Sequence, residues 1–93
     1  METNDYPPGE FQPRHLSQEE IDNPYLVIEE LFSYGQLPEV REQLWAMLKA
    51  GVTGNFNELF TPVERSNMFY FYELMAKVVE ANYLIRLRQK AAA

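Results

Sequence analysis

The side chains that could act as a nucleophile or a base are few and are poorly placed for catalysis. His15 is the only histidine, and it lies in a proline-bearing segment without helical periodicity. Ser17, Ser33 and Ser66 have no base at a spacing that would activate a hydroxyl group. We therefore expect no nucleophilic catalytic site.

Metal ligands and phosphate-binding loops do not form a recognisable pattern either. The chain has no cysteine and no Glu-x-x-His motif, so the usual ligand spacings for zinc and di-iron sites do not occur. The segment "GVTG" at residues 51–54 lacks the lysine and the preceding strand of a phosphate-binding loop. We expect no metal, no cofactor and no small-molecule substrate, and we expect that the protein is not an enzyme.

The charged residues are explained by helix ends and polar faces. Glu29 and Glu30 are neighbours on an expected helix and would point about 100° apart, which does not suit a catalytic carboxylate pair. The basic cluster Arg86, Arg88 and Lys90 stands where cations stabilise a helix C-terminus, with phosphate contact as the alternative interpretation.

The distribution of charge limits the class of partner. The net charge of −6 argues against general binding to nucleic acid. Residues 1–40 contain nine acids and one base, whereas residues 41–93 contain five acids and seven bases. The acidic side of residues 19–39 suggests a regulator that binds a basic partner protein. An ordinary solvated surface is the simpler interpretation.

The sequence shows no membrane or secretion signal. No run of about 18 apolar residues is present, so we expect no membrane span. The first residues, "METNDYPPGEFQPRHL", lack the cationic start and apolar core of a signal peptide. Together with the absence of cysteine, this pattern predicts a cytoplasmic protein.

The chain divides into three segments. Prolines and a glycine without periodicity predict that residues 1–16 form a flexible, extended or disordered arm, with Phe11 and Tyr6 as residues that could dock it to the body. Residues 17–90 are expected to form one helical domain, and residues 91–93 a disordered tail.

The first helix has a clear start, whereas its end depends on the effect of Pro24. Ser17 and Glu20 have the spacing of a capping box, and Leu16 and Ile21 that of a hydrophobic staple. Pro24 either kinks this helix or separates two helices, and we favour separation, with Asn23 capping the second helix. Gly35 is expected to end that second helix. Its apolar face is predicted to contain Tyr25, Ile28, Leu31 and Phe32.

The next helix is predicted over "LPEVREQLWAMLKAG", with Gly51 as its end. Its core stripe is expected to consist of Val40, Leu44, Met47 and Leu48. Trp45 points about 100° away from this stripe.

The remaining sequence predicts one short helical turn and one long helix. Phe56, Leu59 and Phe60 suggest a turn that closes the end of the core, and Thr61, Pro62 and Glu64 begin the last helix. No strand pattern occurs. We predict an all-α protein, a small three- to four-helix bundle with a long C-terminal helix and an extended or disordered N-terminal arm.

The last helix contains "FYFY" at residues 69–72 and is apolar around about two thirds of its circumference. A helix that packs on one neighbour needs an apolar stripe only a little over 100° wide. A helix over residues 62–90 would be about 43 Å long, and a compact domain of this size is only about 32 Å across. We therefore expect the end around residues 83–87 to extend past the body. The broad apolar surface indicates either a central helix wrapped by the others or a helix with a second, intermolecular face.

We favour the intermolecular interpretation, a homodimer through the last helix, with another protein partner as the second possibility. An enzyme subunit that supplies no catalytic groups but completes the fold of another chain is a further alternative. Asn82 could fix the pairing of two such helices, or it could bond to a backbone carbonyl nearby. The residues expected at the interface are Trp45, Phe69, Tyr72, Ala76, Tyr83 and Leu87.

Overall fold

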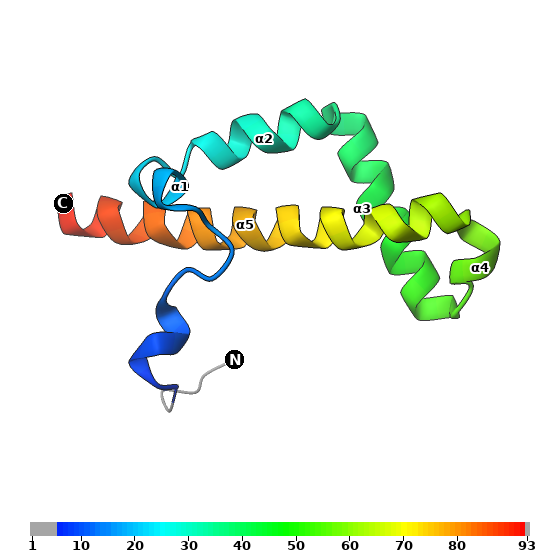
Figure 1. The fold of residues 1–93 in the computed structure, drawn as a ribbon, viewed down its shortest axis with the longest axis horizontal. Coiled ribbons are helices and arrows are strands. Elements are labelled where there is room, and N and C mark those ends of the chain that lie inside the picture. Colours follow the sequence, from blue (N-terminus) through cyan, green and yellow to red (C-terminus); the bar gives the residue numbers. More distant parts are fainter. Residues whose placement is uncertain (1–5, 93) are drawn as a thin grey trace.

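A computed structural model describes residues 6–92, except for the side chain of Phe56. All regular structure in this range is helical (Figure 1). The elements are the 3-10 turn η1 (Pro8–Phe11) and the α-helices α1 (Gln18–Asp22), α2 (Leu26–Tyr34), α3 (Leu37–Thr53), α4 (Phe56–Leu59) and α5 (Pro62–Ala92). The predicted all-α fold with a long C-terminal helix is confirmed.

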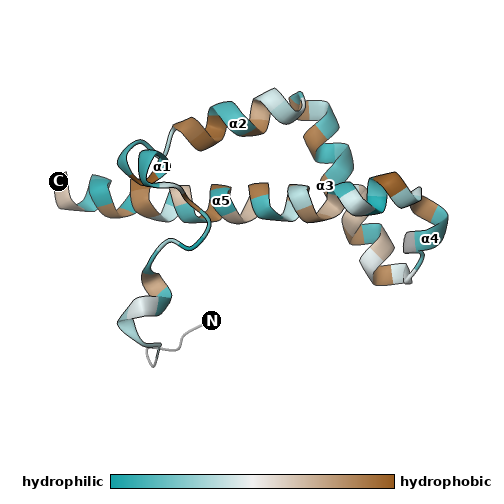
Figure 2. Ribbon diagram, in the orientation of Figure 1, coloured by the Kyte–Doolittle hydropathy of each residue, from teal (hydrophilic) through white to brown (hydrophobic). Residues whose placement is uncertain are grey.

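Helix α5 runs the length of the molecule, and the other elements are arranged along it (Figure 1). Its 31 residues correspond to about 46 Å at 1.5 Å per residue. The longest dimension of the whole molecule is 47 Å. Hydrophobic residues recur along the full length of α5 (Figure 2).

Helix α2 packs antiparallel to α5. Val27, near the start of α2, belongs to the same core cluster as Ala81. At the other end of α2, the ring of Tyr34 lies 5.5 Å from the ring of Phe71. The sequence number thus rises along α2 as it falls along α5. Leu16, Ile21, Val78 and Leu84 complete this core cluster.

The start of α1 and the break at Pro24 were predicted correctly. The Glu20 backbone N–H donates to the Ser17 hydroxyl, and the Ser17 backbone N–H donates to the Glu20 carboxylate. Helix α1 ends at Asp22, and α2 begins at Leu26. Asn23 accepts a bond from the Leu26 N–H through its carbonyl, and no side chain caps α2. The expected Asn23 side-chain cap is therefore absent.

The predicted inner face of α2 was wrong in part. Tyr25, Ile28 and Phe32 are exposed, whereas Val27 is fully buried. The inner face instead carries Val27, Glu30 and Tyr34, which occur three and four residues apart. This orientation arises because Glu30 binds Lys77 and Tyr34 packs on Phe71, both on α5.

The predictions for α3 also need correction. The helix continues past Gly51 to Thr53, and Gly54 ends it with a φ of 73°, in the left-handed region that favours glycine. Leu44 and Leu48 are exposed, and the buried residues are Val40 and Ala50. Val40 is buried as predicted. Ala50 lies about 80° from Val40 on the side away from Leu44 and Leu48, so the buried side of α3 is rotated away from these leucines.

The connection into α5 follows the prediction. Phe60 is buried after the single turn of α4. Thr61 and Glu64 form the expected reciprocal capping bonds, at 2.8 and 3.2 Å. Helix α5 continues to Ala92, beyond the predicted end at residue 90. Residues 1–5 of the predicted arm and residue 93 of the predicted tail lie outside the described residues.

The C-terminal half of α5 is partly covered, contrary to the expectation that it would extend past the body. Helix α1 lies against it, with Ile21 and Leu84 packed on the core cluster. The Arg88 guanidinium donates to the Ile21 carbonyl at 2.6 Å. The expected overhang assumed a compact body about 32 Å across, whereas the molecule is 47 Å long and α1 and α3 lie near opposite ends of α5 (Figure 1).

The molecule is elongated. Its radius of gyration is 15.8 Å, compared with about 12 Å for a compact domain of this length. None of the described helices combines the length and the apolar character needed to span a membrane.

Candidate interaction surface

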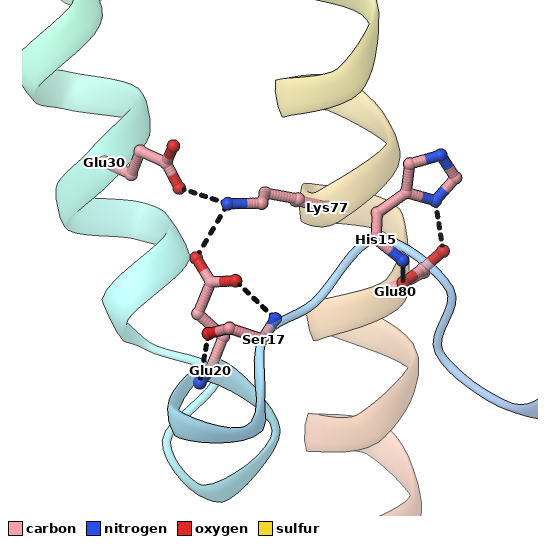
Figure 3. A network of polar contacts seen from close by, with 6 residues as sticks. All are labelled: His15, Ser17, Glu20, Glu30, Lys77 and Glu80. Atoms are coloured by element: carbon pink, nitrogen blue, oxygen red, sulfur yellow. Dashed lines mark hydrogen bonds and ion pairs between the residues drawn. The ribbon is translucent and has the colours of Figure 1, made fainter.

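A polar network fixes α1 and α2 to α5 (Figure 3). The Lys77 ammonium group lies 2.9 Å from the Glu20 carboxylate and 3.0 Å from the Glu30 carboxylate. Burial alone would raise the pKa of Glu20, but hydrogen bonds from Ser17 and Lys77 outweigh it and lower the pKa. Burial alone would lower the pKa of Lys77, and its two carboxylate partners outweigh it and raise the pKa. These groups serve the fold, because both carboxylates share the one ammonium group of Lys77 and join α1 and α2 to α5.

A second polar contact anchors the N-terminal arm. One oxygen of Glu80 accepts the backbone N–H groups of Arg14 and His15, at 3.0 and 2.9 Å. The other oxygen lies 2.7 Å from Nδ1 of His15 (Figure 3). Burial alone would raise the pKa of Glu80, but these contacts outweigh it and lower the pKa. The single histidine of the chain thus holds the arm against α5.

The environments of residues 69–72 explain the "FYFY" sequence. Phe71 is completely buried, and its ring packs against Tyr34 on α2. Phe69 is 78% exposed and Tyr72 is 61% exposed. Phe69 and Phe71, which point about 160° apart, therefore serve different sides of α5, Phe71 in the core and Phe69 toward solvent.

One side of α5 carries a stripe of six apolar residues, which we call the open face; four of them are exposed, and Ala76 and Tyr83 are half-buried. Five of its six residues were predicted from the sequence. Val79, 69% exposed, was not included in the sequence prediction although the helical period places it within about 20° of Tyr72. The open face consists of Phe69, Tyr72, Ala76, Val79, Tyr83 and Leu87.

The arm lies beside the C-terminal part of the open face. Phe11 and Pro13 line a pocket with Val79 and Tyr83. The His15 ring approaches the Tyr72 ring edge-on, at 6.4 Å between centroids. The arm therefore shields part of Tyr83 but leaves most of Val79 exposed.

A groove between α3 and α5 adjoins the N-terminal part of the open face. It has a volume of about 550 Å³. Its lining residues are Met47, Arg65, Met68, Phe69 and Tyr72. The groove could not be predicted from the sequence, because the crossing of α3 over α5 depends on contacts between distant segments.

Trp45 is separate from this surface. Its side chain is 61% exposed on α3, as expected from its position off the core stripe. It lies two residues before Met47 and so points about 160° away from the side of α3 that lines the groove. The structure therefore brings together the five predicted residues of α5 but does not place Trp45 beside them.

Asn82 has a local hydrogen-bond partner. Its side-chain amide donates to the Val78 carbonyl of the same helix at 2.8 Å. Of the two interpretations of Asn82, the structure shows the local bond. The open face therefore owes its character to its aromatic and aliphatic residues.

Within residues 6–92, no group of three or more histidine, cysteine or acidic side chains is arranged to hold a metal ion. Comparisons with protein-family models, curated proteins and solved structures find no match to this chain.

Proposed function

We propose that this protein is a small helical interaction module that self-associates through the open face of α5. The exposure of Phe69, Tyr72 and Val79 on a helix whose opposite side lies in the core carries this proposal. Contiguous apolar surface of this kind marks interaction sites, and aromatic residues are enriched in protein interfaces.

The total exposed surface also supports association. The chain exposes 7226 Å², whereas a compact monomer of 10.9 kDa exposes about 5,600 Å². The excess of about 1,600 Å² includes the protruding arm. It is comparable to the area that each subunit buries in a large obligate interface, which is about 1,000–2,500 Å².

Light scattering at several protein concentrations and at low and high salt tests this proposal. We expect a salt-resistant mass of twice 10.9 kDa. Phe69→Glu should shift the mass toward the monomer without changing the helix content in circular dichroism, because the Phe69 side chain is 78% exposed. Val63→Glu is the matched control, since Val63 is similarly exposed on α5 but lies about 120° from Phe69.

A monomeric mass for the unmodified protein at all concentrations would contradict the proposal. A Phe69→Glu variant that keeps the dimeric mass would show that the contact lies elsewhere. Tyr83→Glu provides an independent variant of the same face.

The alternative, binding of a basic partner through residues 19–39, has less support. Glu20 and Glu30 are paired with Lys77 and are not available to a partner. Glu19, Asp22, Glu29 and Glu39 are exposed. Capture of a basic protein that disappears at high salt would favour this alternative.

We also propose a cytoplasmic location, which the absence of cysteine supports.

A further inference from the structure

We propose that the groove between α3 and α5 binds the N-terminal arm, Tyr6–Phe11, of a second copy of the chain. This inference rests on the proposed function, because it requires two copies joined through their open faces. It assigns an occupant to the groove and a role to the arm. A contact between the two α5 helices alone would explain neither feature.

The positions of the two features along α5 suggest the exchange. The arm is held at Glu80 and lies beside Tyr83, toward the C-terminal end of the open face. The groove contains Phe69 and Tyr72, toward the N-terminal end. If two α5 helices pair antiparallel about a two-fold axis between Ala76 and Val79, each C-terminal part lies opposite the N-terminal part of the partner. The arm of each copy then stands beside the groove of the other.

The arm leaves its own body and presents apolar groups. Followed from its contact with Glu80 toward the N-terminus, the arm turns away from α5 and extends from the molecule (Figure 1). Tyr6 and Phe11 are exposed, and their rings pack edge-to-face at 6.4 Å. Pro7 and Pro8 restrict the backbone between them, which reduces the entropy lost when the arm is ordered on a partner.

The groove suits this segment in its chemistry. Met47 and Met68 are flexible apolar side chains that adapt to aromatic rings. Arg65 stands at the edge of the groove, where it donates to the Phe60 carbonyl at 3.0 Å. Glu10 of the arm is acidic and partly exposed, in an exposed pair with Arg14. An arm in the groove would therefore bring a carboxylate close to a guanidinium group.

Disulfide trapping tests the exchange cleanly because the chain contains no cysteine. One chain carries Phe11→Cys, and a second chain, with a tag that changes its mass, carries Met47→Cys. Mixed and oxidised, the two chains should form a disulfide-linked heterodimer. Mixing the Met47→Cys chain with a Phe32→Cys chain is the matched control. Phe32 lies on the outer side of α2 and is exposed to the same degree as Phe11. We expect several-fold more cross-linked product with Phe11→Cys.

Light scattering on the same proteins separates the possible outcomes. A dimeric mass without the Phe11–Met47 cross-link overturns this inference and leaves the proposed function intact. A monomeric mass overturns both. A disulfide within one chain of the Phe11→Cys, Met47→Cys double variant, without one between mixed chains, shows that the arm enters its own groove and also overturns the inference. Tyr72→Cys replaces Met47→Cys if circular dichroism shows that the latter is unfolded.

Discussion

Phe69 and Phe71 are two positions apart on α5 but have opposite environments, and their replacement by alanine should separate the two roles of that helix. Phe71→Ala should lower the free energy of unfolding by about 3–5 kcal/mol, since it leaves a cavity in the core. Phe69→Ala should change it by less than about 0.5 kcal/mol at concentrations where the protein is monomeric. Urea denaturation of both variants measures the difference, and equal losses would contradict the assignment of faces.

The Glu80 carboxylate should make stability depend on pH in the acid range. Its pKa is held below the usual value of 4.5, so the ionised form stabilises the folded state. This contribution is present above pH 4.5 and is lost as the pH falls through the lower pKa of the folded state. Glu80→Gln should therefore reduce the loss of stability below pH 4.5, measured by thermal melts.

Some acid dependence should remain in the Glu80→Gln variant. The pKa of Glu20 is also lowered in the folded state, so it contributes with the same sign. If the pH dependence of the variant equals that of the unmodified protein, the contact of Glu80 with the arm does not stabilise the fold.

At the scale of single elements, the two glycines near the end of α3 should respond in opposite ways to alanine. Gly51 lies inside the helix with open space around it, so Gly51→Ala should stabilise the protein by about 0.5–1 kcal/mol. Gly54 has a φ of 73°, so Gly54→Ala should cost about 1–2 kcal/mol. Thermal denaturation of the two variants measures both changes in stability, and we expect a higher melting temperature for Gly51→Ala and a lower one for Gly54→Ala. The reverse order would mean that the helix ends at Gly51, as the sequence first indicated.

Two helix starts, those of α1 and α5, could be predicted from the sequence because a capping box depends on residues three positions apart. The capping boxes that begin at Ser17 and Thr61 are such local patterns, and both are present in the structure as expected. The end of α3 was harder to predict, because either of two glycines could end the helix and only the backbone conformation decides between them.

Buried faces were harder to predict than helix ends. The inner side of α2 is selected by Lys77 and Phe71, more than 35 residues away in the sequence. Local periodicity could not decide between the side with Val27 and the side with Ile28. The open face of α5 could be predicted because the apolar arc of this helix is too wide for one neighbour, whereas the groove beside it depends on where α3 crosses.

For the molecule as a whole, association should be visible in thermal unfolding. If the elongated shape and large exposed surface reflect a subunit of a dimer, the melting temperature should rise with protein concentration. The expected rise is roughly 4 °C for each tenfold increase, from the usual entropy of unfolding for two chains of 93 residues. Phe69→Glu should remove this dependence. A melting temperature independent of concentration in the unmodified protein would indicate a monomer.

The antiparallel packing of α2 on α5 also determines when the protein can fold during its synthesis. Val27 has its core partner at Ala81, and the carboxylate of Glu20 has its partner 57 residues later, at Lys77. At about 5–20 residues per second, a ribosome needs about 3–11 s to make the intervening 54 residues. During that interval α1 and α2 have no apolar surface to cover them, so the chain closes its core only after nearly all of α5 has been made.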